Sequence, residues 1–296
     1  MRFPAELLES IQNQIKQIDA LLDRNPGVAI ALEPTSTYHM LVAERAFKRG
    51  HTVYLVNPRD LKHFRESHSF RAKTDKIDAW YIGEYVRVYA TKLRPWAPMK
   101  SELRKLKSAI RQWFHASHMR TKLAQVFEGL SSPEIDQAVA AMDELSKASE
   151  KRAIECAKIV DAECYVRMKG AVGVGKLSAC AFTFLYRSKQ FETPDAVRAF
   201  VGLDLRVSDS GKSRGKRFLT KRGDRIIRYA VTCAGRGLLN SKLGSKANED
   251  LKARGRAFDE RMVIASRKVI RTTFALDKQK TRFDPKKFMW RVDTGP

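Results

Sequence analysis

Gly27-Val-Ala-Ile-Ala-Leu-Glu33 is the stretch that decides the fold, because it is an apolar run closed by a carboxylate. Val28–Leu32 has the length and composition of a buried strand. The helical pattern of Tyr38–Arg49 and a second strand-like run, Thr52–Val56, follow it. A strand, a short helical crossover and another strand predict a parallel pair, and therefore an α/β domain.

Most of the remaining chain has helical periodicity, so we expect an α/β part joined to a mainly helical part. Ser101–Lys169 predicts two long helices, broken near Gly129–Pro133, that would form an antiparallel coiled-coil arm. The stretch 59–71 is polar and is expected to be irregular. Further helices are predicted at 5–24, 75–90, 191–202, 224–240 and 261–276.

These patterns divide the chain into four parts. Residues 1–95 form the α/β domain and residues 96–167 the helical arm. Residues 168–280 form a helical domain with a glycine-rich hairpin and a serine loop, and residues 281–296 form a polar tail.

The chain of 296 residues has 57 lysine and arginine residues against 33 aspartate and glutamate residues, a net charge of +24. Such an excess predicts a nucleic-acid partner, because these cations displace the counterions condensed on a polyanion; the alternative is a merely basic protein. No apolar run approaches the roughly 20 residues that span a bilayer, and no secretory signal follows Met1. The spacing of the cysteines fits neither zinc nor a disulfide framework, which predicts reduced thiols in a cytosolic protein: Cys156, Cys164, Cys180 and Cys233.

Three carboxylates are candidate metal ligands. Asp75 and Asp78 are three residues apart in Ala72-Lys-Thr-Asp-Lys-Ile-Asp-Ala79, so a helix that starts at Thr74 places both on one face. Acids that merely stabilise the first helical turn are the alternative. Glu33 ends a strand, where α/β folds collect their sites, and Mg²⁺ prefers such oxygen ligands.

Ser210 lies in the basic, glycine-punctuated stretch Ser208–Arg217. A serine among cations that hold a phosphodiester could attack phosphorus; the alternatives are a turn-forming serine and simple backbone binding. The nearby cations expected to bind nucleic acid are Lys212, Arg214, Lys216, Arg217, Lys221, Arg222 and Arg225.

Gly170-Ala-Val-Gly-Val-Gly-Lys-Leu-Ser-Ala179 opens the second domain. Gly173 and Gly175 could expose backbone N–H groups to a phosphate, as in helix–hairpin–helix DNA binders, or could simply form a tight turn. The stretch is not a P-loop, because Leu177 occupies the Ser/Thr position.

Together these motifs resemble the DEDD transposases of bacterial insertion sequences, the group that includes the Piv and MooV DNA invertases. The resemblance runs in order along nearly the whole chain. Its segments are Leu32-Glu-Pro-Thr-Ser-Thr-Tyr38, Val56-Asn-Pro58, Lys73–Ala79, Gly170–Ala179, Phe200-Val-Gly-Leu203, Ser210-Gly211 and Lys221-Arg-Gly-Asp-Arg-Ile-Ile-Arg228.

The resemblance implies a RuvC-like, RNase H-type domain, a coiled-coil arm and a helical transposase domain. Glu33, Asp75 and Asp78 would be three of four acidic ligands of Mg²⁺ or Mn²⁺, and Ser210 the nucleophile. The implied partners are double-stranded DNA of the element and its target, a structured guide RNA and further copies of the chain in a homodimer or homotetramer. The implied location is the bacterial cytoplasm, in association with the nucleoid.

One family feature is missing: no strand carrying the first aspartate, in a Gly-Ile-Asp pattern, precedes residue 5. Arg2-Phe-Pro4 resembles sequence at the end of the family's third strand, so we expect an N-terminally truncated copy. Two alternatives to an active recombinase follow. One is an inactive relic that only binds nucleic acid, and the other is a Holliday-junction-resolvase-like nuclease that needs the acids but not Ser210.

Overall fold

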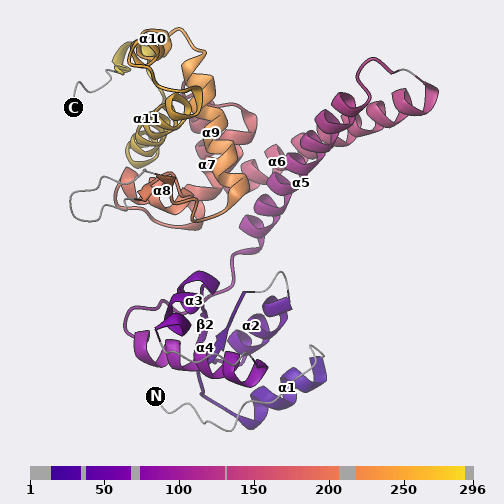
Figure 1. Cartoon of the computed structure of the whole chain (residues 1–296), viewed down its shortest axis with the longest axis vertical. Helices are drawn as coiled ribbons and strands as arrows, with labels where there is room; N and C mark the ends of the chain where they lie inside the picture. The colour runs from indigo at the N-terminus through magenta and orange to yellow at the C-terminus, as the bar shows by residue number, and fades with distance from the viewer. Residues whose placement is uncertain (1–14, 35–37, 68–73, 131, 207–217, 291–296) are drawn as a thin grey trace. The chain divides into compact units, whose positions relative to one another are not determined.

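The structure, a computed structural model, describes residues 15–34, 38–67, 74–130, 132–206 and 218–290. The chain forms two compact units, Met1–Pro98 and Met99–Pro296 (Figure 1). Each unit has hydrophobic clusters of its own. Within the described ranges, no helix combines the length and the apolar character needed to cross a bilayer.

A two-stranded parallel sheet lies at the centre of the first unit, as the sequence predicts. β1 (Ile30–Leu32) pairs with β2 (Val53–Leu55), and α2 (Tyr38–Lys48) connects them. Hydrogen bonds from Ile30 N to Thr52 O and from Val56 N to Leu32 O, both 2.8 Å, extend the ladder at each end. The predicted α/β arrangement of this part is confirmed at this level.

Helices cover both faces of this sheet. On one face, α1 (Ile15–Arg24) and α2 pack against Ile30, Leu32 and Val53. On the other face, α3 (Pro58–Glu66) and α4 (Asp75–Tyr89) pack against Ala29, Ala31 and Tyr54. The alternation of neighbouring strand residues between two apolar layers explains why Val28–Leu32 is apolar throughout.

The expectation that residues 59–71 are irregular was wrong for the first part of that stretch, which forms α3. The side chain of Asn57 accepts a hydrogen bond of 2.9 Å from Arg59 N, and Pro58 at the first helical position fixes a helical φ. Leu61 and Phe64, three residues apart, bury one face of the helix. The charged residues on both sides of these two anchors hid a short amphipathic helix.

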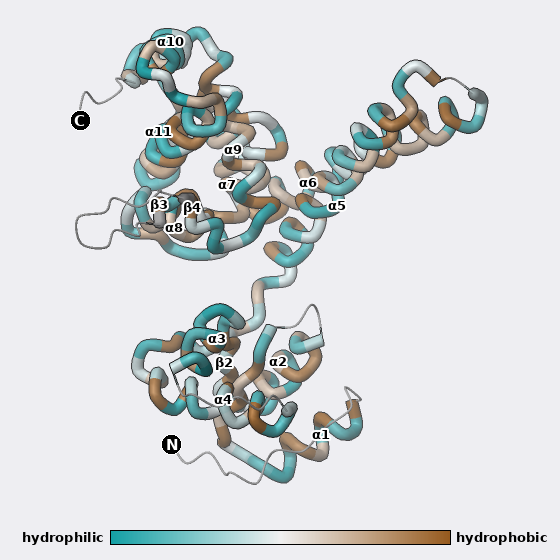
Figure 2. Tube along the Cα trace, in the orientation of Figure 1, coloured by the Kyte–Doolittle hydropathy of each residue, from teal (hydrophilic) through white to brown (hydrophobic). Residues whose placement is uncertain are grey.

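The two long helices predicted for Ser101–Lys169 are present as α5 (Ser101–Val126) and α6 (Pro133–Lys169). They run antiparallel: Ser117 meets Ser146 through hydroxyl groups 3.0 Å apart, and Arg120 pairs with Asp143. Apolar and polar residues alternate along both helices (Figure 2). This alternation is what a helical hairpin with one shared apolar seam requires.

The core of the second unit surrounds α7 (Lys176–Ser188), which is buried from Ser178 to Tyr186. α9 (Arg225–Leu239) and α11 (Phe258–Gln279) pack beside it, and α6 and α5 reach it from the arm. Smaller elements complete the unit: α8 (Pro194–Val201), α10 (Ser245–Ala253), the antiparallel pair β3 (Leu205–Arg206) and β4 (Phe218–Leu219), and the 3-10 helix η1 (Pro285–Lys287).

Aromatic residues from the expected polar tail also pack against this core. Phe283, Phe288 and Trp290 are partly buried against it, and the Lys268 ammonium donates a hydrogen bond to Met289 O. The described part of the 281–296 segment therefore contributes apolar area to the second unit.

Glycines let the hairpin before α7 approach α9 closely. Gly173 has φ +79°, and a Cβ there would lie 2.5 Å from both Ala234 O and Leu238 N. Gly237 faces it from α9, where a Cβ would lie 2.4 Å from Gly173 O. Backbone contact at this distance excludes any side chain.

We expect Gly173→Ala to destabilise the second unit by about 2–4 kcal/mol, because it combines a left-handed backbone with overpacking. Gly175→Ala is the matched control, since Gly175 has φ −78° and no atom within 4 Å of an added Cβ. Thermal unfolding followed by circular dichroism measures both. Equal melting temperatures for the two variants would contradict the close packing at Gly173.

Candidate functional site

The three candidate carboxylates belong to one side of the small sheet. Glu33 directly follows β1 and is half-buried. Side chains alternate along a strand, so position 33 continues the face of Ala29 and Ala31, which pack in the same cluster as α3 and α4. Asp75 and Asp78 lie in the first turn of α4, and α4 packs against β1.

The sequence correctly predicts how α4 begins. Thr74 Oγ1 accepts a hydrogen bond of 3.3 Å from Ile77 N, and Thr74 O accepts one of 2.9 Å from Asp78 N. The free N–H groups of this first turn favour the negative charges of Asp75, which is exposed, and of Asp78.

Arg65 is a site residue that the sequence did not reveal. Its Nη2 lies 3.3 Å from Asp78 Oδ1, with both side chains about three-quarters covered. The contact is an ion pair without hydrogen-bond geometry, because Arg65 Nη2 and Nε have no hydrogen-bond partner in the described part of the chain. The guanidinium also lies 5.8 Å from the centre of the Tyr81 ring. Arg65 therefore partly neutralises Asp78 from α3.

The chemistry of the Asp75 and Asp78 side chains suits a hard divalent cation. Mg²⁺ is usually held by one or two carboxylates together with waters and substrate phosphate oxygens, so two acids on one helical turn can serve. Among the described residues, no group of three or more His, Cys, Asp or Glu residues is gathered as a metal site. Glu33 therefore shares a face with this pair without forming a three-carboxylate cluster.

Ser210, Lys212, Arg214, Lys216 and Arg217 lie outside the described residues. The structure does describe the two strands from which their segment starts and ends. β3 and β4 pair antiparallel, with Leu205 opposite Leu219 and Arg206 opposite Phe218. A further hydrogen bond of 2.9 Å runs from Thr220 N to Asp204 O. Arg206 and Phe218, the described residues on either side of 207–217, are thus paired.

The turn Lys221–Asp224 follows β4, and Gly202 and Gly223 allow it to pack closely against the end of α8. Lys221 and Gly223 have φ of +51° and +93°, and Lys221 N donates a hydrogen bond to Gly202 O. A Cβ at Gly202 would lie 1.9 Å from Arg222 O, and one at Gly223 would lie 2.2 Å from Phe200 O. The turn and the end of α8 therefore touch backbone to backbone.

Arg228 and Asp224 also stabilise this turn. Arg228 Nη1 donates to the carbonyl oxygens of Val201, Lys221 and Arg222 at 3.1–3.4 Å. Asp224 Oδ1 accepts hydrogen bonds from Ile226 N and Ile227 N, which caps α9, and Asp224 Oδ2 lies 3.4 Å from Lys107 Nζ.

The predicted binding residues Lys221, Arg222 and Arg225 remain exposed, and none forms a salt bridge within the described ranges. These three cations are available to an anionic partner.

The two glycines of the predicted hairpin differ in their surroundings. Gly173 is packed against α9, whereas Gly175 is exposed at the N-terminus of α7 and makes no close contact. The adjacent Lys176 pairs with Glu150 of α6. The first-turn N–H groups of α7 could therefore face an anion at Gly175, while Gly173 has a packing role.

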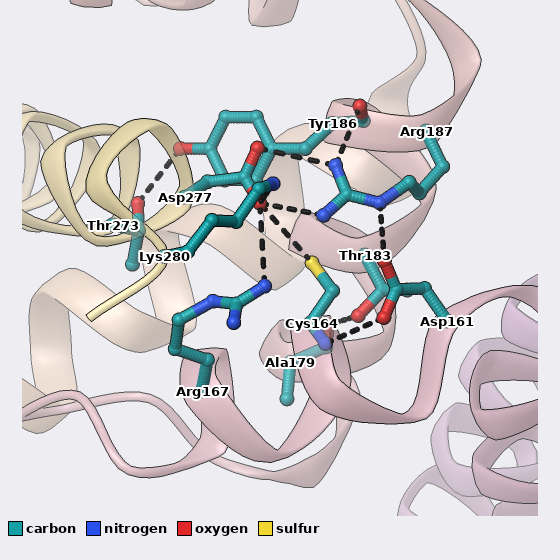
Figure 3. A network of polar contacts seen from close by, with 10 residues as sticks. All are labelled: Asp161, Cys164, Arg167, Ala179, Thr183, Tyr186, Arg187, Thr273, Asp277 and Lys280. Carbon is teal, nitrogen blue, oxygen red and sulfur yellow. Dashed lines mark hydrogen bonds and ion pairs between the residues drawn. The ribbon is translucent and has the colours of Figure 1, made fainter. Parts of the chain in front are cut away.

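A polar network at the end of α7 was not predicted (Figure 3). Arg187 donates to Asp277 at 2.6 and 3.1 Å and to Asp161 at 2.7 Å. Burial, the largest single influence, would raise the pKa of Asp277, but the hydrogen bonds and charge of Arg187 together with those of Lys280 outweigh it and hold that pKa below its usual value. Asp277 and Asp161 lie 90 and 26 positions from Arg187 in the sequence, so the three side chains come together only when the chain folds.

Asp161 interrupts α6, since its φ of −167° and ψ of 99° are not helical. Its Oδ1 accepts a hydrogen bond of 2.8 Å from Cys164 N, so it caps the last part of that helix. The Cys164 sulfur lies 3.7 Å from Asp277 Oδ1, and burial is the main cause that raises the pKa of this thiol to about 11. Cys164 is consequently a neutral core residue.

Comparison with known proteins gives two matches, both to transposases. Residues 5–130 match the family model of DEDD transposases of the IS110 type, and residues 167–247 match that of the Transposase IS116/IS110/IS902 family. The two matches lie in the order of the predicted motifs. The chain belongs to the IS110 family of DEDD transposases. It is thus a DNA-binding protein of an insertion sequence. No curated protein matches the chain.

We expect Arg228→Ala to lower the free energy of unfolding by roughly 2 kcal/mol, because it releases three carbonyl oxygens held by one charged donor. Arg225→Ala in the same helix is the control and should leave stability unchanged, since that exposed side chain has no salt bridge among the described residues. Binding to duplex DNA should respond to Arg225→Ala instead. Denaturant unfolding and fluorescence anisotropy measure the two effects; a destabilised Arg225→Ala variant would refute this division of roles.

We expect Asp277→Asn to destabilise the second unit by about 3 kcal/mol at neutral pH, because it removes a mostly buried partner of Arg187. The folded pKa of Asp277 is depressed, so its contribution is present above the unfolded pKa of about 3.9 and is lost as the pH falls through the folded value. The difference in the free energy of unfolding between Asp277→Asn and the wild type should therefore become smaller below about pH 4. Asp143→Asn, at an exposed ion pair on the arm, should change stability little at any pH. A gap independent of pH would contradict the ionised state of Asp277.

Proposed function

We propose that this transposase cuts and rejoins DNA through Ser210. The Ser210 hydroxyl oxygen attacks the phosphorus of a phosphodiester, and a bond from that oxygen to phosphorus replaces the bond to the 3′ oxygen. The departing 3′ oxygen takes up a proton and leaves as a hydroxyl, while the proton of the serine is given up. A 3′ hydroxyl of another strand then attacks the same phosphorus and restores the serine. Each step replaces one phosphoester bond with another, so no oxidant is needed.

The observation that carries this proposal is membership of the family, combined with the paired strands that bracket the serine segment. A nucleophile works when its position relative to the reacting atom is fixed. β3, β4 and the turn at Gly223 provide a fixed base for the segment that contains Ser210. Lys221, Arg222 and Arg225 beside that base would hold the backbone phosphates of the duplex.

Asp75 and Asp78 would hold a divalent cation, Mg²⁺ or Mn²⁺, whereas Glu33, the third ligand that the family resemblance implies, is not gathered with them among the described residues. When bound, such an ion stabilises negative charge that develops at the phosphate. Asp75 is the more available acid, since Asp78 is paired with Arg65. The Arg65 guanidinium would keep the Asp78 carboxylate oriented toward the first turn of α4 and moderate its charge.

The further assignments form part of the same proposal. The first unit would correspond to a RuvC-like domain, and residues 96–167 to a coiled-coil arm between it and the transposase domain at 168–280. The partners would be double-stranded DNA of the element and its target, with a structured guide RNA on the remaining basic surface. Strand exchange between two sites requires at least two copies of the chain, as a homodimer or homotetramer.

Ser210→Ala should abolish covalent protein–DNA adducts on DNA that carries the element's own ends, at least about 100-fold, because the attacking oxygen is gone. DNA binding should stay within about twofold, since the cations remain. Ser208→Ala and Ser213→Ala in the same stretch are matched controls that should keep adduct formation. Denaturing gel electrophoresis of end-labelled DNA gives the readout.

Adducts that persist in the Ser210→Ala variant would remove this serine from the mechanism. Free 5′ phosphates from the wild type without any adduct would favour a resolvase-like nuclease. Tight, salt-sensitive binding with neither product at any Mg²⁺ or Mn²⁺ concentration would favour a protein that only binds nucleic acid.

A further inference from the structure

A pocket of about 600 Å³ opens at the C-terminal ends of α7 and α11 in the second unit. Its walls carry four cations, Arg187, Lys189, Lys278 and Lys280, together with the aromatic residues Phe191 and Phe274. Asp277 is the one acidic residue in its described lining. We call this site the cationic pocket.

The Asp277 carboxylate is already shared among several cations (Figure 3). It accepts two hydrogen bonds from Arg187, pairs with Lys280 at 3.3 Å and lies 3.8 Å from Arg167 Nη2. Asp161 is the second carboxylate of this group and binds Arg187. Three cations thus face two carboxylates, which leaves one positive charge in excess beneath the cationic pocket.

Arg167 is the cation that is least satisfied. Its side chain is only 8% exposed, and its Nε has no hydrogen-bond partner within the described ranges. The electric field of a buried, incompletely paired guanidinium extends further than that of a guanidinium in water, because the protein interior screens it less. The positive potential at this site therefore does not come from surface lysines alone.

Aromatic rings hold the two remaining lysines at the rim. Lys189 Nζ lies 5.8 Å from the centre of the Phe191 ring and 5.3 Å from that of Phe200. Lys278 Nζ lies 5.7 Å from the centre of the Phe274 ring. Both residues are exposed, and neither forms a salt bridge in the described part of the chain. Cation–π contacts restrict the ammonium groups and so reduce the entropy lost when they bind an anion.

The four cations and Asp277 that line the cationic pocket, with Arg167 and Asp161 behind them, therefore carry a net charge of +3. We propose that it binds a backbone phosphate of a nucleic acid, as a contact site additional to the serine segment and the Lys221–Asp224 turn. Phosphate oxygens accept hydrogen bonds from several cations at once, and their negative charge makes each of these bonds stronger than one to a neutral ligand. Lys278 and Lys280 lie beyond the residues that the family models match.

The Lys189→Ala/Lys278→Ala double variant tests this site. Both the variant and its parent carry Ser210→Ala, so that strand cleavage, and with it the proposed serine chemistry, has no influence on the result. The probe is a labelled 30-base-pair duplex, and anisotropy gives its dissociation constant over a range of KCl concentrations. We expect binding to weaken about tenfold, and the slope of log affinity against log salt to fall by about one to two.

Lys246→Ala/Lys252→Ala on α10 is the matched control, because it removes the same charge from two exposed lysines of the same unit. It should change the affinity less than about twofold and leave the salt slope unchanged. Lys189→Arg/Lys278→Arg keeps the charge and the ring contacts, and should bind like the parent. Circular dichroism melting verifies that all three variants fold.

Two results would overturn the proposal. One is an equal loss of duplex affinity in the pocket variant and the α10 control, which would mean that only total charge matters. The other is titration calorimetry in which inorganic phosphate binds the parent but not the pocket variant, while both bind the duplex equally. That outcome would identify a site for free phosphate rather than for nucleic acid.

Discussion

The surplus of positive charge is the constraint on which the rest of this structure depends. With 57 cationic and 33 acidic residues, many cations must lack a carboxylate partner, so the position of each acid decides which cations are structural. Asp277 and Asp161 hold Arg187, Asp224 holds Lys107, and Asp19 holds Arg45 and Arg49. These acidic residues thus join helices to one another, and the turn after β4 and the rim of the cationic pocket keep free charge for a polyanion.

Arginine stabilises this chain in a second way, through backbone carbonyl groups. Arg228 binds three carbonyl oxygens of neighbouring segments, and Arg267 donates to Leu203 O at 3.1 Å. Burial lowers the pKa of both guanidinium groups, yet an arginine remains charged at any physiological pH. In a basic protein, arginine side chains can therefore hold loops in place through backbone carbonyl groups, and no carboxylate is needed for this.

Local sequence patterns correctly predicted the features that depend on interactions between residues close together in the sequence. The parallel strands, the Thr74 cap and the break between α5 and α6 follow from apolar runs, capping residues and a Gly–Pro segment, and the structure contains each of them. α3 was missed because charged residues hid its two apolar anchors. The Arg187–Asp277 network and the contact of Gly202 with the backbone of Arg222 were not predictable, because each joins residues whose proximity depends on the packing of whole helices. The order of the carboxylates along the chain identified candidates, but the ion pair of Arg65 with Asp78 depends on how α3 packs against α4.

The interruption of α6 at Asp161 has a mechanical consequence. Residues 133–160 precede the break and form a helical lever of roughly 40 Å at 1.5 Å per residue. The orientation of this lever at its base depends on the packing of Ala153 and Ala157 in the core of the second unit and on Asp161, which is itself tied to Arg187 and to the backbone of Cys164. A change of ten degrees at that base would move the far end by roughly 7 Å, about the length of five residues of helix. Helix packing and a few polar bonds in the core of the second unit thus set the direction in which the arm points.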